Sequence, residues 1–145
     1  MRVLVTGGAG YIGSHTAKAL SRAGHQPVIL DNFSAGHRWA VKWGPLAEGD
    51  LADQDFIRHA LHEFGIQAVI HFAAAALVPE SVANPRKYYW NNVVNSLRLL
   101  DAMTHAGVRN IVFSSSCATY GVPSRVPIPG TTRSSPLTLT ARQNW

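Results

Sequence analysis

Three glycines near the start of the chain stand at a spacing that can cradle a phosphate group. The run TGGAGYIG (residues 6–13) joins an apolar stretch to a helical pattern. In such a turn Gly7 allows a sharp bend, Gly10 lets the backbone approach a pyrophosphate, and Gly13 lets the helix pack on the strand. The N–H groups and positive dipole end of the helix would face the phosphates. Many glycine-rich turns are only loops, but the flanking strand and helix favour dinucleotide binding here.

Two acidic residues follow later strand-like segments. Asp31 lies 18 residues beyond Gly13. A carboxylate at this point could accept hydrogen bonds from ribose hydroxyls and would repel a 2′-phosphate, which favours NAD over NADP. The alternative is that Asp31 only starts a turn with Asn32. Asp50, followed by Leu51, suits an adenine contact at a strand end, although its spacing fits a helix-capping aspartate nearly as well.

Further polar residues stand where strands are expected to end. Ser114 to Ser116 fall at the carboxyl end of a predicted strand, where open α/β sheets bind ligands; the alternative is that they only satisfy backbone groups. His71 is interpreted as a packed residue and Cys117 as a structural one, since it has no basic activator. The histidines show no metal-ligand spacing, so no metal site is predicted.

The residues named above must be positioned by regular secondary structure. The chain alternates strand-like and helical segments that can do this. Strands are expected at residues 2–6, 26–30, 46–49, 67–72 and 110–114, and helices at 11–23, 53–64 and 85–106. Residues 32–44 are expected to form a loop. The pattern predicts an α/β fold: a Rossmann-type, doubly wound parallel sheet, truncated at about five strands.

Composition narrows the classes of protein. The chain has 145 residues, 46% of them hydrophobic, and a net charge of +5. Its basic residues are scattered, which disfavours nucleic-acid binding. No apolar run is long enough to span a bilayer. The single cysteine excludes an internal disulfide framework, and no secretory signal opens the chain, so a cytoplasmic location is expected.

The chain resembles the extended short-chain dehydrogenase/reductase family and, within it, the UDP-glucose 4-epimerases. The segments that carry the resemblance are TGGAGYIGSH (6–15), GDL (49–51), HFAA (71–74), VPES (78–81), YYWNNVVNSLRLLDAM (88–103) and FSSSCATYG (113–121). The resemblance implies NAD as cofactor, held by Gly7, Gly10, Tyr11, Ile12, Gly13, Asp31, Asn32, Phe33, Ser34, Ala35, Gly36, Asp50, Leu51, Phe72, Ala73, Ala74, Ala75, Ala76 and Asn91.

The resemblance also implies a reaction. A UDP-hexose would be epimerised at C4 through a transient 4-keto sugar, with Ser116 bonded to the reacting hydroxyl, and the full-length form would be a homodimer. The chain departs from the family at two points. Some members have a lysine at the position of Ala76. The Tyr-x-x-x-Lys pair that should follow the proline-rich stretch is missing, so the chain as written is expected to be catalytically incomplete.

Two other functions stay open. A nucleotide-sugar dehydratase or decarboxylase of the same family is one, although dehydratases place an acidic pair where this chain has Cys117 and Ala118. The other is a non-catalytic NAD-binding fragment. An activity assay separates these functions.

Three regions are expected: an incomplete NAD-binding Rossmann domain at residues 1–129, an aberrant tail at 130–145, and a C-terminal substrate domain that is absent. With permitted synonymous bases, residues 137–145 can be encoded by CTA-ACC-CTT-ACG-GCA-AGA-CAA-AAC-TGG. Read from the third base, these codons encode Asn-Pro-Tyr-Gly-Lys-Thr-Lys-Leu, which contains the missing pair. The tail is therefore predicted to be a frame-shifted copy of the active site.

Overall fold

The apolar runs of the sequence form one parallel sheet. The computed structural model describes residues 1–136, and within them five strands lie in the order β3-β2-β1-β4-β5. The strands are β1 (Arg2–Thr6), β2 (Gln26–Asp31), β3 (Leu46–Glu48), β4 (Ala68–His71) and β5 (Asn110–Phe113). All four pairings are parallel. The predicted truncated Rossmann-type sheet is thereby confirmed, and no strand end is displaced by more than one residue.

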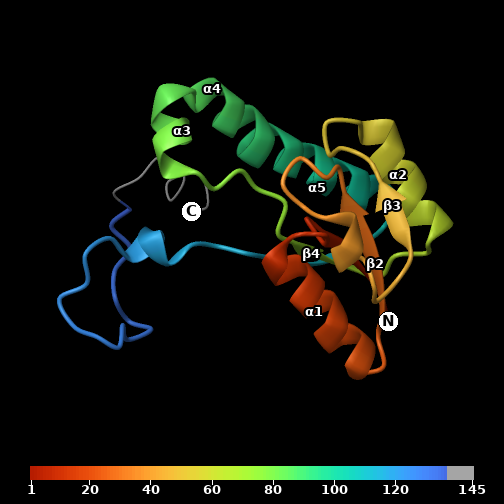
Figure 1. Cartoon of the computed structure of the whole chain (residues 1–145), viewed down its shortest axis with the longest axis horizontal. Coiled ribbons are helices and arrows are strands. Elements are labelled where there is room, and N and C mark those ends of the chain that lie inside the picture. Colours follow the sequence, from red (N-terminus) through yellow and green to blue (C-terminus); the bar gives the residue numbers. More distant parts are fainter. Residues whose placement is uncertain (137–145) are drawn as a thin grey trace.

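Helices cover both faces of the sheet (Figure 1). The helix α1 (Tyr11–Arg22) lies on one side, and α2 (Gln54–Glu63) and α5 (Asn95–His105) lie on the other. The larger core cluster joins strand residues such as Leu4 and Val69 to Ile57 of α2 and Leu99 of α5. The Asp53 carboxylate accepts the Phe56 N–H at 3.0 Å, which makes it the N-cap predicted for the second helix.

The helix expected over residues 85–106 is divided in the structure. It consists of α4 (Pro85–Tyr88), a π-helical segment η2 (Tyr89–Val94) and α5. A short helix that the sequence analysis missed, α3 (Val78–Ala83), precedes them. A six-residue helix is too short to show an apolar period, so only its proline near the first position could have indicated it. A π segment widens the helix locally and is common at functional sites.

The loop at residues 32–44 contains one short 3₁₀ helix, η1 (Arg38–Ala40), and a second, η3 (Cys117–Tyr120), follows β5. The predicted frame-shifted residues 137–145 lie outside the described part of the chain. Among the helices of residues 1–136, none is both long and apolar enough to cross a membrane.

Candidate cofactor-binding site

A groove runs along the carboxyl edge of the sheet. It consists of two adjoining hollows of about 450 and 610 Å³ that share the glycine turn and residues 72–76. The first hollow extends toward Ser114–Ser116, after β5. The second extends past Asp31 and Asp50 and reaches α3 and α4. The groove therefore lies at the carboxyl ends of β1 and its neighbours β2 and β4, where the connections after β1 and after β3 run in opposite directions along the sheet. This switch point is the usual ligand site of open α/β sheets.

Gly7 and Gly13 of the glycine turn have no room for a side chain. Gly7 has φ +65°, and a Cβ atom there would lie 2.9 Å from the Ala73 nitrogen. A Cβ atom on Gly13 would overlap the carbonyl oxygen of Gly7. Within residues 1–136, no side chain caps α1 and no acidic residue occupies its first turn. The first N–H groups of a helix have no intrahelical acceptors, so this end of α1 suits an anion.

Two apolar side chains stand at the mouth of this turn. Tyr11 is 81% exposed and Ile12 is 59% exposed, and both line the groove. Large apolar side chains that are exposed to solvent beside a pocket favour the binding of a ligand that buries them. The close backbone and these open side chains together fit the pyrophosphate and flanking rings of a dinucleotide.

The Asp31 carboxylate is buried beside the turn. Its Oδ2 accepts the Ala9 N–H at 2.9 Å, and its Oδ1 accepts the Phe33 N–H at 2.8 Å. Asp31 therefore also starts a turn, which was the alternative interpretation. Since each carboxylate oxygen has two lone pairs, both oxygens can still accept from ribose hydroxyls.

Asp50 lines the second hollow, so its predicted adenine contact stays a prediction. Its Oδ1 accepts the Ala52 N–H at 2.7 Å, which closes a turn after β3, but Asp50 does not cap a helix, because the N-cap of α2 is Asp53. Its Oδ2 accepts from Asn32 Nδ2 at 2.6 Å. Asn32 in turn accepts the Ser34 N–H at 2.9 Å. These bonds fix the loops after β2 and β3 beside the second hollow.

His71 is buried in a hydrogen-bond chain under the first hollow. The Ser96 hydroxyl donates to the Asn92 carbonyl at 2.6 Å, so His71 Nε2–H must donate to Ser96 Oγ, at 3.0 Å. The Nδ1 atom then accepts from the Thr6 hydroxyl at 2.7 Å. Burial lowers the pKa of His71 to about 4, which keeps the ring neutral. His71 is packed, as expected, and its hydrogen bonds link β1, β4 and α5.

Asn92, which the sequence analysis did not single out, holds the backbone of the segment after β4 that lines the groove. Its Oδ1 accepts the Ala75 N–H at 2.8 Å and its Nδ2 donates to the Ala75 carbonyl at 3.0 Å. The adjacent Asn91 was predicted to face the cofactor and lines the second hollow. The π segment thus places Asn91 at the second hollow and the buried Asn92 at the first; only the Asn-Asn pair could have indicated both.

Ser116 lies half-buried at the far end of the first hollow, with Ser114 and Ser115. Its Oγ accepts the Ala118 N–H at 3.2 Å, which caps η3. A serine hydroxyl that accepts one bond keeps its proton for donation to a ligand oxygen. Cys117, expected to be structural, is exposed.

The groove brings together the predicted site residues with one exception. The lining includes Gly7, Gly10, Tyr11, Ile12, Gly13, Asp31, Asn32, Ser34, Ala35, Gly36, Asp50, Leu51, Phe72, Ala73, Ala74, Ala75, Ala76, Asn91 and Ser116. Phe33 is not in it; the Arg38 guanidinium lies over its ring, 4.5 Å from the centroid. In the described residues no group of three or more His, Cys, Asp or Glu could hold a metal ion.

Comparisons with known proteins agree with this geometry. The sequence profile of the NAD dependent epimerase/dehydratase family matches residues 3–143. The UDP-glucose 4-epimerase of Rhizobium leguminosarum bv. trifolii is 48% identical over 143 residues, which are 99% of this chain and 44% of that protein. That of Corynebacterium glutamicum is 53% identical over 129 residues, 88% of this chain and 39% of that protein.

Solved structures give the same result. The UDP-glucose 4-epimerase from Brucella ovis, in complex with NAD, superposes with a TM-score of 0.93 at 51% identity. The match covers 99% of this chain and 44% of that one. The chain therefore spans less than half the length of these relatives and matches their N-terminal part.

Proposed function

The chain belongs to the NAD dependent epimerase/dehydratase family, and from this we propose that it forms the NAD-binding part of a UDP-glucose 4-epimerase. The groove carries the proposal. Its glycine turn excludes side chains beside an uncapped helix end, and Asp31 stands next to it. Relatives named UDP-glucose 4-epimerase support the specific reaction and a UDP-hexose substrate. Residues 1–129 would form the incomplete Rossmann domain.

Residues at different places in the groove would contact different parts of the cofactor and substrate. The N–H groups at the start of α1 would bind the pyrophosphate, and Asp31 would accept from the adenosine ribose. When bound, NAD would supply a hydride acceptor for C4 of the sugar and return the hydride to either face. Ser116 would donate to the reacting hydroxyl and orient it. No Tyr-x-x-x-Lys pair occurs in the sequence to move the hydroxyl proton, so the chain as written should not turn over.

We further propose that the full-length form is a homodimer and acts in the cytoplasm. Leu97 and Leu100 on α5 are 56% and 42% exposed, which supports an association surface on this helix. The exposed thiol of Cys117 suits a reducing compartment. Light scattering of the full-length protein tests the dimer; a monomer at micromolar concentration would contradict it.

Two measurements test the function. Calorimetry of the chain should show NAD binding and weaker NADP binding, and equal affinities would contradict the role of Asp31. A coupled assay should show no conversion of UDP-galactose to UDP-glucose by the chain, and conversion after the reading frame is restored. Release of water with a 4-keto-6-deoxy product from the restored protein would instead identify a dehydratase. Binding with no turnover in either form would leave a non-catalytic NAD-binding protein.

A further inference from the structure

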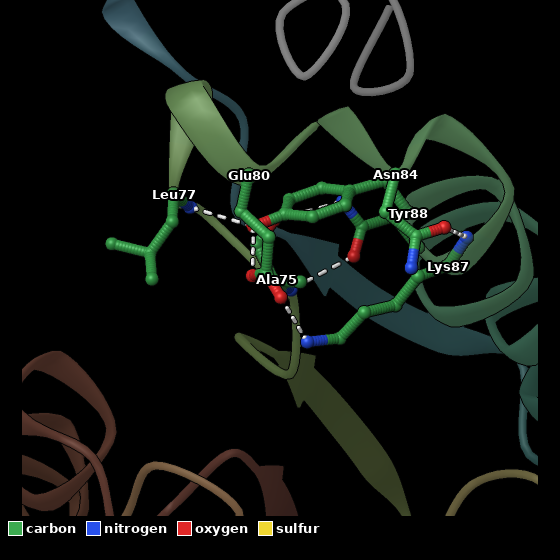
Figure 2. Close-up of polar contacts among 7 residues, drawn as sticks. Ala75, Leu77, Glu80, Asn84, Lys87 and Tyr88 are labelled. Carbon is green, nitrogen blue, oxygen red and sulfur yellow. Dashed lines mark hydrogen bonds and ion pairs between the residues drawn. The ribbon is translucent and has the colours of Figure 1, made fainter. Parts of the chain in front are cut away.

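The outer end of the groove carries a cluster of polar side chains on α3 and α4 (Figure 2). The Tyr88 hydroxyl accepts the Leu77 N–H at 3.2 Å and donates to Glu80 Oε2 at 2.7 Å. The other carboxylate oxygen, Oε1, pairs with the Lys87 ammonium. Since Tyr88 is fully buried, its ring is fixed by packing. The Tyr88 hydroxyl and the Lys87 ammonium therefore each bind one oxygen of the Glu80 carboxylate, and the carboxylate fixes the position of the ammonium.

Most charged side chains that line the groove are negative, and Lys87 is the exception. Asp31, Asp50 and Glu80 supply three carboxylates to the second hollow. Against them, Lys87 is the only lysine or arginine that lines either hollow within residues 1–136. A pyrophosphate adds further negative charge to this groove. The glycine turn offers it N–H groups and a helix dipole, which is equivalent to only about half a charge. A full positive charge can come from Lys87.

The position and partner of Lys87 suit this role. Lys87 lies one helical turn before Asn91, and both line the second hollow. The Lys87 and Glu80 side chains are 52% and 37% exposed, and an ion pair so open to water contributes little stability. A phosphate can therefore take or share the ammonium at small cost. The Glu80 carboxylate raises the pKa of Lys87, so the ammonium stays charged.

We propose that Lys87 is the cationic contact of the groove for a phosphate of the bound dinucleotide, and that Glu80, fixed by Tyr88, positions it. The proposal rests on the proposed function, because it assumes that the groove binds a dinucleotide. Lys87 touches the ligand, whereas Glu80 and Tyr88 act through Lys87.

Calorimetry with NAD tests the proposal on the whole chain. Lys87→Met removes the charge and keeps the length, and should weaken NAD binding roughly tenfold. Lys87→Arg should restore the affinity to within about threefold. Lys18→Met, on α1 where the ammonium lies 5.6 Å from the Trp43 ring centroid, is the matched control and should bind like the unmodified chain. Raising the salt concentration should weaken binding more in the unmodified chain than in Lys87→Met.

A second ligand shows whether the contact is to a phosphate. ADP binding should be weakened by Lys87→Met as NAD binding is, while binding of adenosine, followed by NMR shifts, should be unchanged. An equal loss with adenosine would show that Lys87 shapes the groove and would overturn the proposal. If the unmodified chain and Lys87→Met bind NAD equally, the proposal fails while the proposed function stands. If the unmodified chain binds no NAD, both fail.

Discussion

At the level of single residues, Asp31 joins the glycine turn to the loop after β2. Its two oxygens accept from Ala9 and Phe33, so the carboxylate is oriented before any ligand arrives. A preoriented charged acceptor loses little freedom on binding, which strengthens each hydrogen bond that it adds. In the proposed function, the same charge would oppose a 2′-phosphate on a ribose bound at Asp31.

Replacing Asp31 with alanine should therefore weaken NAD binding by about 1–3 kcal/mol, for the loss of charge-assisted hydrogen bonds to the ribose. The preference for NAD over NADP should shrink at the same time, because the repulsion is removed. Calorimetry with both dinucleotides measures these changes. Asp55→Ala removes an exposed carboxylate from α2 and is the control. An unchanged NAD:NADP ratio in Asp31→Ala would refute the assignment.

Because burial lowers the pKa of His71, we expect the free energy of unfolding to depend on pH. Its pKa is about 4 in the fold, against 6.5 for an ordinary histidine, so the unfolded chain binds more protons between these values. The free energy of unfolding should accordingly fall as the pH falls from 6.5 toward 4. The His71 contribution between pH 7 and pH 5 should be roughly 2 kcal/mol. Well above pH 6.5 the ring is neutral in both states and contributes no slope.

Urea unfolding at pH 7 and pH 5 measures this effect. His71→Gln keeps an N–H donor for Ser96 but does not titrate, so its stability should depend less on pH than that of the unmodified chain. His62→Gln removes an exposed histidine from α2 and should retain the full dependence. A His71→Gln variant with the original pH slope would show that other groups cause it.

At the level of elements, the packing of α1 against its own turn determines how closely a ligand can approach. A Cβ atom on Gly13 would overlap the Gly7 carbonyl oxygen and lie 2.7 Å from the Gly8 Cα. Both obstacles are backbone, which cannot rotate away as a side chain can. The glycines of this turn therefore place the whole N-terminus of α1 against the sheet edge.

Gly13→Ala should displace the start of α1 and lower NAD affinity at least tenfold, with a loss of thermal stability. Gly24→Ala, at the other end of the same helix, is the control. It introduces backbone strain without the steric overlap that Gly13→Ala creates. Gly24 has φ +79° with nothing within 4 Å of a Cβ atom, so the change should cost only about 1–2 kcal/mol of stability. Its NAD affinity should match that of the unmodified chain below the melting temperature. A Gly13→Ala variant that binds normally would disprove the role of the turn.

At the level of the whole molecule, β5 is an edge strand of the sheet within residues 1–136. Val112 and Phe113 of β5 are 62% and 44% exposed, although a Rossmann-type sheet buries such residues under further elements. An apolar edge strand in water favours association with other chains. This surface agrees with the match to only the N-terminal part of longer relatives.

The gene sequence decides the origin of residues 137–145, for which we propose a shifted reading frame. The shift should lie between the codons of Pro129 and Leu137, and the third-base frame should encode Tyr-Gly-Lys-Thr-Lys followed by a longer open frame. Restoring the frame should restore the dyad and with it epimerase turnover. Third bases that give no tyrosine and lysine in the shifted frame would refute the proposal.

The amino-acid sequence alone determined the order of the five strands, the helices α1 and α2, the glycine turn and the placement of Asp31 and Ser116 at strand ends. These are local features: apolar periods, glycine spacing and a residue's position at the end of an element. The apolar period also predicted a single helix over 85–106, and the family resemblance included Phe33 in the site. Neither the π segment nor the direction of the Phe33 ring has a local signal.

Only the tertiary structure decided which polar side chains meet. Thr6 and His71 are 65 positions apart and become neighbours because β1 and β4 pair in one register. The π segment turns Asn92 onto Ala75, and the packing of α3 on α4 brings Glu80 to Tyr88 and Lys87. Strand register and helix rotation are set by how distant apolar faces fit together, and no single segment of the chain contains that information.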